Sequence, residues 1–469
     1  MDIKTKIVAT LGPSSDTYDT IKALLDAGLD LARINMSHGK WEEHKAKIDV
    51  INQLRNDGYF VGIMMDLKGP KIRCGTFEND GIDLAKGDII RIVKEDVVGN
   101  KERFSVSYKG LYDDLIVGDY FTFDDGLLGF KVINKEEPST LVCEVQNNYF
   151  LKNRKGLNAP YIKLMNEYMS EKDKNDIELI SKEDVNFVAA SFVRRKEDVM
   201  EIRRLLASLG RDDIKIVSKI ESPEGVENID DILEVSNAVM VARGDLGVEV
   251  DLTEVPNIQK ELIHKCNLAG KPVIVATHML DSMQTNPRPT RAEVSDVFNA
   301  ILDGADAVML SGESATGKYP VESVKTQDQI ARKAEEILEY EKFANEFYEA
   351  SNKSQGDAIG ISVATSALML DAKLVVMFSH EFSAVRKLSK FKIKAPVVAF
   401  VNDKASANAL NGLYYGINPV YVKKSVTNTD EYANRIAKQY GVKKGETIII
   451  VGVNEENNKA NTMKIMQVK

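Results

Sequence analysis

Eight short apolar runs, separated by segments with helical periodicity, constrain the fold of this chain most strongly. They occupy residues 7–10, 31–35, 61–66, 187–192, 214–217, 238–242, 273–277 and 307–311. Continuous apolar strands that alternate with amphipathic helices are typical of a parallel sheet whose outer face is covered. Eight such units predict an α/β fold built on a closed (β/α)8 barrel, or TIM barrel.

Polar side chains follow these runs at their carboxyl ends. In a barrel of this kind the catalytic groups gather on that rim. We therefore expect a shared site for the polar residues at the run ends, which are Arg33, Asn35, Asp66, Lys219, Glu221, Asp245, Thr277 and Ser311.

The repeat of strand and helix is interrupted once and followed by a different pattern. Residues 73–160 show short alternating runs divided by turn signals such as Asp80-Gly81 and Asp125-Gly126, which predict a small β-barrel inserted as a lid. After a helix near 321–341 and a polar linker near 351–356, apolar runs at 374–377, 396–400, 419–422 and 447–451 predict an α/β sandwich. The predicted domains are a barrel of residues 1–72 and 161–342, an all-β lid of 73–160 and a C-terminal α/β domain of 355–469.

Composition excludes several classes of function. The chain has 469 residues, 43% hydrophobic and 28% charged, as in ordinary globular proteins. Its net charge is −9 and no basic block stands out, so we expect no nucleic-acid or membrane partner. The three cysteines lack metal-ligand spacing, and neither a signal peptide nor a membrane span is evident. We expect a cytoplasmic protein.

Lys219 and Glu221 form the most informative local pattern. Residues two apart on a strand face the same side, so the ammonium and the carboxylate point at one site. A buried lysine is costly unless its charge meets a partner. Asp245, beside Gly244, ends the next run and supplies a second carboxylate. Two carboxylates suit a divalent cation, and the lysine suits a developing oxyanion.

Other motifs leave two interpretations open. Arg33 suits a phosphate, but it could equally close the barrel through a salt bridge. The segment 66–73, with one carboxylate and three cations, fits either the site or a solvated hinge. The Thr277 hydroxyl could bond a substrate carboxylate, whereas Thr290 and Glu293 fit a helix capping box. The five histidines lack the grouping of a zinc site.

Five segments together resemble the pyruvate kinase family, and the resemblance covers essentially the whole chain. They are residues 33–39, 66–73, 218–221, 240–247 and 286–293. The resemblance implies a phosphotransferase of the last step of glycolysis, which converts phosphoenolpyruvate and ADP to pyruvate and ATP. It also implies Mg²⁺ or Mn²⁺ as cofactor and a homotetramer, the habit of the family.

Roles for individual residues follow from the same resemblance. Arg33 and Arg73 would hold the phosphoryl group, Glu221 and Asp245 the divalent metal, and Lys219 would stabilise the transferring group and the enolate. The substrate carboxylate would meet the Gly244 and Asp245 amides and the Thr277 hydroxyl. The nucleotide positions would be Asn35, His38, Arg73 and Lys155. The proton that reaches the enolate is assigned to a water relay near Thr277, Ser311 and Glu313.

The chain departs from the family pattern at three places. Members that need K⁺ hold it at positions matching Asn35, Ser37, Asp66 and the Leu67 backbone, and carry Glu where this chain has Lys71. The lysine can replace the cation's charge, so K⁺ is predicted not to be required. The loops 378–383 and 454–458 carry acidic residues, as Glu381 and Glu455, where activated members bind sugar phosphates, so activation by fructose bisphosphate is not expected. His278 and Asp281 replace Gln and Glu, and we attach no change to them.

Two other classes of function share part of this residue pattern. A metal-dependent aldolase or lyase could also use two carboxylates and an arginine, but the inserted lid with Lys155 and the pairing of Lys219 with Glu221 disfavour it. A catalytically silent paralogue would have lost site residues, whereas Arg33, Lys219 and Thr277 are all present.

Overall fold

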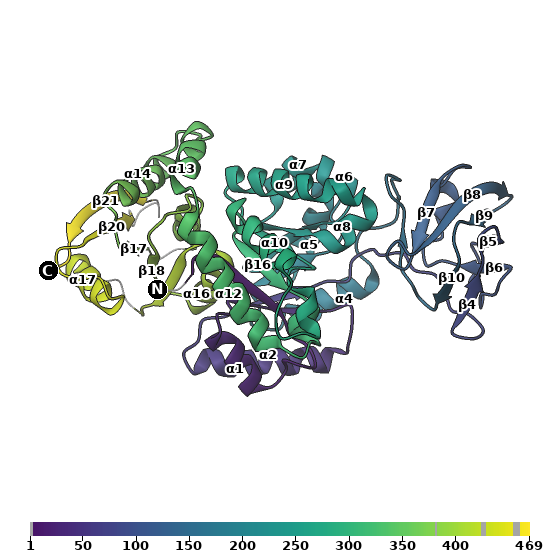
Figure 1. Ribbon diagram of the computed structural model, residues 1–469, viewed down its shortest axis with the longest axis horizontal. Coiled ribbons are helices and arrows are strands. Elements are labelled where there is room, and N and C mark those ends of the chain that lie inside the picture. Colours follow the sequence, from purple (N-terminus) through teal and green to yellow (C-terminus); the bar gives the residue numbers. More distant parts are fainter. Residues whose placement is uncertain (1–2, 380–381, 424–427, 454–459) are drawn as a thin grey trace.

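Eight parallel strands close into a barrel at the centre of the molecule (Figure 1). The computed structural model describes residues 3–379, 382–423, 428–453 and 460–469. Around the barrel the strands follow the order β1-β16-β15-β14-β13-β12-β3-β2, which confirms the predicted fold. Their bounds are β1 Lys6–Thr10, β2 Leu31–Asn35, β3 Gly62–Asp66, β12 Phe187–Ala190, β13 Lys215–Ile220, β14 Ala238–Ala242, β15 Val273–Ala276 and β16 Ala307–Leu310.

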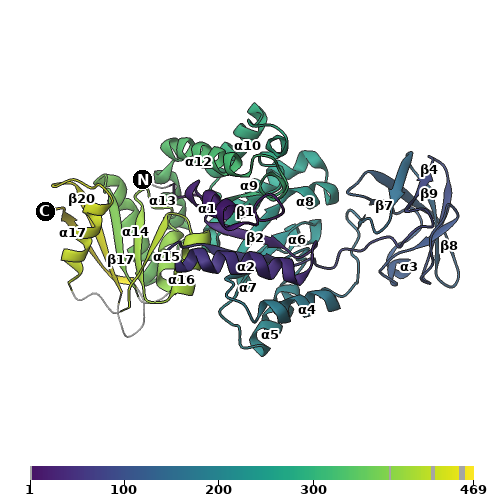
Figure 2. The same cartoon turned by 90° about the horizontal axis from the view of Figure 1, so that it is seen from below.

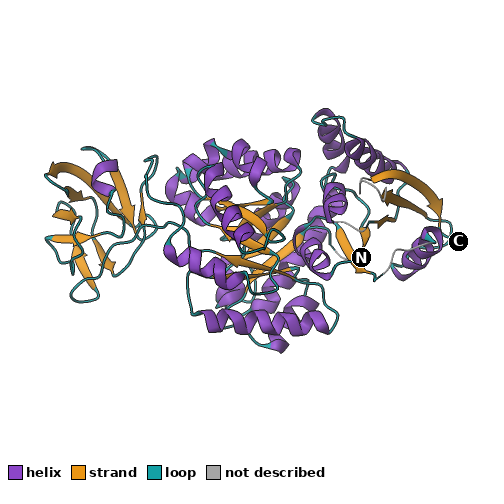
Figure 3. Cartoon of the chain, turned by 180° about the vertical axis from the view of Figure 1, so that it is seen from behind, coloured by secondary structure: helices purple, strands orange, loops and turns teal. Residues whose placement is uncertain are grey.

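Amphipathic helices cover the outer face of the barrel (Figure 3). In α2 the buried side chains Ile48, Ile51 and Leu54 recur at helical spacing and face the strands. The predicted capping box is confirmed at α10, where the Thr290 amide donates to Glu293 Oε2 at 2.7 Å. The barrel helices are α1 Tyr18–Asp26, α2 Trp41–Asn56, α4 Glu171–Ile180, α5 Lys196–Ser208, α6 Pro223–Glu227, α7 Ile229–Val235, α8 Arg243–Glu249, α9 Val255–Ala269, α10 Arg291–Leu302, α11 Gly312–Ala315 and α12 Pro320–Ile337, with 3₁₀ turns at Leu252–Glu254 and Asp281–Gln284.

The inserted segment extends beyond the carboxyl end of β3, at one end of the molecule (Figures 1 and 2). Its strands form a six-stranded sheet, β11-β7-β8-β9-β5-β6, and a two-stranded sheet, β10-β4. They enclose a separate aromatic core that includes Phe104, Phe121 and Phe130. The elements are β4 Gly81–Leu84, β5 Ile89–Val93, β6 Arg103–Ser105, α3 Leu111–Asp114, β7 Tyr120–Phe123, β8 Leu128–Glu136, β9 Thr140–Val145, β10 Tyr149–Lys152 and β11 Leu157–Asn158.

A five-stranded sheet of order β19-β18-β17-β20-β21 forms the opposite end of the molecule. Its strands are β17 Leu374–Phe378, β18 Val397–Val401, β19 Ile417–Tyr421, β20 Thr447–Val453 and β21 Ala460–Gln467. The helices of this part are α13 Tyr340–Glu349, α14 Gln355–Met369, α15 Phe382–Ser389, α16 Lys404–Leu413 and α17 Thr429–Gln439. No helix among the described residues has the length and apolar character that a membrane crossing requires.

The structure corrects the prediction in two places. The helix expected at 321–341 ends at Ile337 because Leu338 is extended, and a separate helix, α13, follows and buries Phe343 and Phe347. The strand β21, antiparallel to β20, was not predicted. Of the two loops considered for a sugar phosphate, His380, Glu381 and residues 454–458 lie outside the described residues.

The floor of the barrel and the C-terminal part share one apolar core. Interior side chains of the strands, such as Leu31 and Met64, belong to the same buried cluster as Leu410 and Leu413 of α16. The backbones of the barrel and of α16 come close together at two glycines: a Cβ added to Gly62 would lie 3.3 Å from the Cα of Gly412. The floor is thus closed by another part of the chain, and the opposite rim stays open to the inserted segment.

Candidate active site

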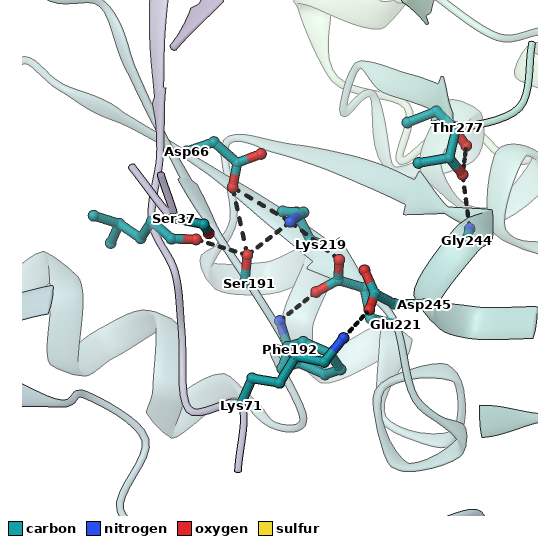
Figure 4. A network of polar contacts seen from close by, with 12 residues as sticks. Ser37, Asp66, Lys71, Ser191, Phe192, Lys219, Glu221, Gly244, Asp245 and Thr277 are labelled. Carbon is teal, nitrogen blue, oxygen red and sulfur yellow. Dashed lines mark hydrogen bonds and ion pairs between the residues drawn. The ribbon is translucent and has the colours of Figure 1, made fainter. Parts of the chain in front are cut away.

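A buried cluster of opposite charges lies where β2, β3 and β13 end. Arg33 Nε donates to Asp66 Oδ2 at 2.6 Å. Lys219 Nζ lies 3.3 Å from Asp66 Oδ1 (Figure 4). The Asp66 residue is only 1% exposed. Arg33 Nη1 also donates to Thr10 Oγ1 at 2.8 Å, so both of its bonds fix it to neighbouring strand ends. Arg33 therefore makes the salt bridge that the sequence left open, and its guanidinium still lies on the rim.

Glu221 completes this cluster from the end of β13. Its Oε1 lies 3.0 Å from Lys219 Nζ, and its Oε2 accepts a 2.6 Å hydrogen bond from the Phe192 amide. Lys219 Nζ also donates to Ser191 Oγ at 2.7 Å, and Ser191 in turn donates to the Leu67 carbonyl at 2.8 Å. The ammonium is thereby held in one position by two carboxylates and a hydroxyl.

The charges in the cluster stabilise one another against burial. Burial favours the neutral form of Asp66, but the positive charges of Lys219 and Arg33 prevail and lower its pKa. Burial likewise favours neutral Lys219, but Asp66 and Glu221 outweigh it and raise the lysine pKa, so the ammonium stays charged. For Glu221, burial prevails over the attraction of Lys219 and raises the pKa to about 7.

A second ion pair links the barrel rim to the inserted segment. Lys71 Nζ lies 2.9 Å from Asp245 Oδ1 on α8 and 3.1 Å from Asp125 Oδ1 beyond β7. The turn before it requires glycine: Gly69 has φ +70°, and an added Cβ would lie 2.8 Å from the Cβ of Ser191. The chain can therefore turn away from β3 while Ser191 keeps its place beside Lys219.

Thr277 lies on the far side of the same rim, after β15. Its hydroxyl accepts a 2.7 Å hydrogen bond from the Gly244 amide, and its carbonyl accepts one of 2.6 Å from Arg243 Nη2. Thr277 and His278 have φ values of +72° and +54°, which non-glycine residues rarely adopt. Strain of this kind persists only where surrounding contacts impose it, and here Arg243 supplies one of them.

Not all of the predicted site residues meet in this cluster. Arg73 Nη1 donates to the Arg154 carbonyl at 2.9 Å, and Lys155 Nζ lies 2.8 Å from Asp124 Oδ1, so both are bound within the inserted segment. Asn35 Oδ1 accepts a hydrogen bond from the Ser37 amide at 3.0 Å, and His38 is exposed.

Three residues that the sequence analysis did not single out hold the predicted ones in place. They are Thr10, Ser191 and Arg243, which bond Arg33, Lys219 and Thr277 respectively. Thr10 and Ser191 lie in the apolar runs, at or near their carboxyl ends, so the rule that polar strand ends meet could have found them.

The donor set fits a hard divalent cation. Glu221 Oε1 is buried and lies 3.0 Å from Lys219 Nζ, but it accepts no hydrogen bond from any described residue, so it has lone pairs left for a cation. Asp245 is bound through Oδ1 to Lys71, and its other oxygen forms no hydrogen bond or ion pair with the part of the chain that the structure describes. Mg²⁺ is commonly held by one or two carboxylates together with water and phosphate oxygens. Among the described residues no group of three or more acidic, histidine or cysteine side chains could hold a metal.

Comparison with known proteins identifies the family. Residues 3–324 match the family described as "Pyruvate kinase, barrel domain", and residues 357–466 match "Pyruvate kinase, alpha/beta domain". The chain belongs to the pyruvate kinase family. The pyruvate kinase of Bacillus licheniformis is 45% identical over 98% of this chain and 80% of its own length, and that of Geobacillus stearothermophilus is 46% identical over 99% and 80%.

A solved structure agrees with the sequence relatives. The crystal structure of a pyruvate kinase from Cryptosporidium parvum superposes with a TM-score of 0.94 at 33% identity, covering 100% of this chain and 96% of that one. As a pyruvate kinase, the chain is a phosphotransferase that passes the phosphoryl group of phosphoenolpyruvate to ADP, with pyruvate and ATP as products.

Proposed function

We propose that this transfer takes place over the cluster of Arg33, Lys219 and Glu221. The observation that carries the proposal is the position of Lys219 Nζ, which is buried on the rim and lies 3.0 Å from Glu221. Phosphoryl transfer asks the protein mainly for positioning and charge neutralisation. In this proposal Arg33 and Arg73 hold the phosphoryl group, and Lys219 neutralises the charge that develops on it and on the enolate.

The substrate carboxylate is assigned to the other side of the rim. The Gly244 amide donates to Thr277 Oγ1 at 2.7 Å, so the two groups already face one another. We assign the carboxylate to the Thr277 hydroxyl and to the Gly244 and Asp245 amides. Binding there exchanges the amide–hydroxyl bond for bonds to the ligand.

Mg²⁺ or Mn²⁺ is assigned to Glu221 and Asp245. When bound, the cation would supply positive charge that neutralises part of the negative charge on the substrate. The Glu221 carboxylate is held on both sides, by the Phe192 amide at Oε2 and by Lys219 Nζ at Oε1.

The nucleotide is assigned to Asn35, His38, Arg73 and Lys155, where the inserted segment joins the barrel. Lys155 and Arg73 belong to the root of that segment, where Arg73 and Gly156 form a β-bridge. If the inserted segment moves over the rim as a lid, it would carry Arg73 and Lys155 toward the phosphates of the nucleotide.

The enolate is assigned a proton from a water relay beside Thr277, Ser311 and Glu313. Glu313 is buried, and its carboxylate accepts hydrogen bonds from the Ser311 amide at 2.7 Å and the Leu280 amide at 3.1 Å. These bonds fix the loop that would order the water. A threonine hydroxyl alone is too weak an acid for this step.

Lys71 is assigned the electrostatic role that a monovalent cation plays elsewhere, so activity does not require K⁺. Its ammonium lies at Asp245 and Asp125 rather than among Asn35, Ser37, Asp66 and the Leu67 carbonyl. The positive charge of Lys71 therefore acts from beside Asp245, on the side of the rim assigned to the substrate. Turnover measured in a K⁺-free buffer should be unchanged when K⁺ is added; a large increase would refute the assignment.

The central role of Lys219 is tested by Lys219→Met. Loss of one preorganised donor to a developing oxyanion costs about 3–4 kcal/mol, so turnover should fall at least about a hundredfold while ADP affinity is little changed. Lys215→Met is the matched control, because Lys215 begins the same strand and its Nζ is engaged away from the rim, by the Asp213 carbonyl at 2.8 Å and the Phe382 ring at 4.4 Å. Near-normal turnover of Lys219→Met would exclude the proposed site.

Three further assignments complete the proposal. The domains are a barrel of residues 1–72 and 161–342, a lid of 73–160 and a C-terminal domain of 355–469. The protein is placed in the cytoplasm, and assembly as a homotetramer is proposed from the family resemblance. Sedimentation of the purified enzyme tests the assembly.

A further inference from the structure

A cavity of about 190 Å³ lies between the barrel and the two connections that lead into and out of the inserted segment. The outgoing connection lines it with residues 70–72, and the returning connection lines it with residues between 157 and 166. The barrel closes it with the loop after β12, with α6 and its N-cap, and with the end of α8. Figure 1 shows both connections between the barrel and the inserted segment. The cavity therefore lies where the position of the inserted segment on the barrel is set.

The walls of this cavity are largely apolar. Their apolar side chains include Ile72, Leu157, Ile162, Leu164 and Phe192. A cavity of about 150 Å³ that is lined by Leu, Ile and Phe stays dry and binds a benzene ring. The cavity of this chain therefore has room for a molecule of one or two fused rings, and its lining favours an aromatic one.

The charged side chains on the walls already have partners. By their closest N···O distances, the ion pairs are Lys71–Asp245 at 2.9 Å, Glu224–Arg195 at 2.9 Å and Lys163–Glu227 at 3.9 Å. Arg194 Nη1 donates to the Leu164 carbonyl at 2.8 Å and to Asn166 Oδ1 at 2.9 Å. A charged ligand would have to compete with these contacts, so the cavity suits a neutral molecule.

A carboxyl oxygen on the wall is left for a ligand. Glu249 lines the cavity and is 8% exposed, and its Oε1 accepts a 2.7 Å hydrogen bond from Asn158 Nδ2. No residue in the described part of the chain donates a hydrogen bond to Glu249 Oε2. Burial raises the pKa of Glu249 to about 7, as expected beside an apolar space. An N–H group on the ligand is the partner that this oxygen lacks.

We propose that this cavity binds a small neutral aromatic molecule that carries an N–H group. The ring packs against Ile72, Leu157 and Leu164, and the N–H donates to Glu249 Oε2. Because both connections form the walls, the bound molecule joins the inserted segment to the barrel and limits its movement; this second part rests on the proposed role of the segment as a lid. None of the described residues assigned to the substrate, the divalent metal or the nucleotide lines the cavity, so the site is separate from the one that performs phosphoryl transfer.

The test is calorimetric titration of the full-length enzyme with indole and, separately, with 1-methylindole, whose ring nitrogen carries no hydrogen. Mg²⁺ and saturating phosphoenolpyruvate, without ADP, fill the active site in each titration. Leu164→Trp fills the cavity, and Leu164→Ala removes a contact with the ring. The matched control is Met165→Trp, because Met165 is the next residue, is 70% exposed and does not line the cavity. Melting followed by circular dichroism shows whether each variant is folded.

The expected result is one site for indole, with 1-methylindole bound about fivefold more weakly because it cannot donate to Glu249. The dissociation constant for indole should rise about tenfold or more in Leu164→Trp, rise about threefold or more in Leu164→Ala and stay unchanged in Met165→Trp. Absence of binding, or equal affinity in Leu164→Trp and the unmodified enzyme, would overturn the proposal. If Leu164→Trp does not fold, Leu164→Ala decides in the same way. Equal binding of the two indoles would overturn the bond to Glu249.

The effect on the lid has a separate measurement. Saturating indole should lower turnover with phosphoenolpyruvate and ADP about twofold or more in the unmodified enzyme and in Met165→Trp, and should leave the turnover of Leu164→Trp unchanged. Binding of indole without any change in turnover would overturn the restraint of the inserted segment. That result differs from a failure of the proposed active site, which Lys219→Met tests without indole.

Discussion

Replacement of Glu249 by glutamine should stabilise the protein at high pH and have little effect at low pH. Glu249 ends α8 on the barrel, is 8% exposed, and accepts a 2.7 Å hydrogen bond from Asn158 Nδ2 of the inserted segment. Burial raises its pKa from 4.5 to about 7, against the opposing influence of Asn158 and Lys71. The oxygen of the same side-chain amide, Asn158 Oδ1, is buried and accepts no hydrogen bond from any described residue.

The sign of the effect follows from proton linkage. A carboxyl group whose pKa is higher in the folded state binds its proton more tightly there, so the free energy of unfolding falls as pH rises from 4.5 toward 7 and is constant above. A shift of this size corresponds to about 3 kcal/mol. Glu249→Gln removes the buried charge, and its amide can also donate to Asn158 Oδ1. The gain should be about 3 kcal/mol at pH 8.5 and under about 1 kcal/mol at pH 5.

Urea unfolding of the variant and the unmodified protein at both pH values measures this difference. Hydrogen exchange in residues 157–164 reports on the junction itself, where protection should rise in the variant at pH 8.5. Glu254→Gln, at an exposed glutamate in the turn after α8, is the control and should be neutral at both pH values. The same gain at pH 5 and pH 8.5 would show that Glu249 is ionised throughout and would refute the reasoning.

Three other substitutions have defined outcomes. Ser191→Ala removes the hydroxyl that accepts a bond from Lys219, and steady-state turnover should fall about tenfold or more; unchanged turnover would mean that the two carboxylates suffice. Lys392→Met leaves Asp306 buried without its partner and should lower the free energy of unfolding by about 3–5 kcal/mol in urea titrations, an effect that Asp306→Leu in the same chain should largely reverse. Gly69→Ala should reduce turnover because an added Cβ lies 2.8 Å from the Cβ of Ser191; a fully active variant would show that the turn adapts freely.

The barrel was predictable because its signal is local and repeated. Each strand buries both faces, so its sequence is a continuous apolar run, and the first polar residue beyond it falls on the rim. Lys219 and Glu221 could be paired from their spacing alone, and the structure brings their charged atoms to 3.0 Å. Arg33 and Asp66, on neighbouring strands, could be placed on the rim from the strand ends.

The parts that could not be predicted depend on contacts between distant segments. The strand β21 carries Lys464 and Asn461 on a sheet edge, and its pattern is too polar to stand out until β20 pairs with it. The bond between Lys71 and Asp245 joins residues 174 positions apart, through a turn whose direction the sequence does not specify. For Arg73 and Lys155 the family resemblance indicates a nucleotide, whereas the structure shows each bound to its own segment.

The shared core beneath the barrel has a consequence for how this architecture can be recombined. The inserted segment brings its own aromatic interior and meets the rim through polar contacts, so a different segment could replace it without exposing the barrel. The C-terminal part cannot be exchanged in that way. Its helix α16 covers apolar side chains of the barrel interior, and a substitute would have to match them, including the close approach of Gly412 to Gly62. In this chain, one neighbour of the barrel has a core of its own and the other shares the core of the barrel.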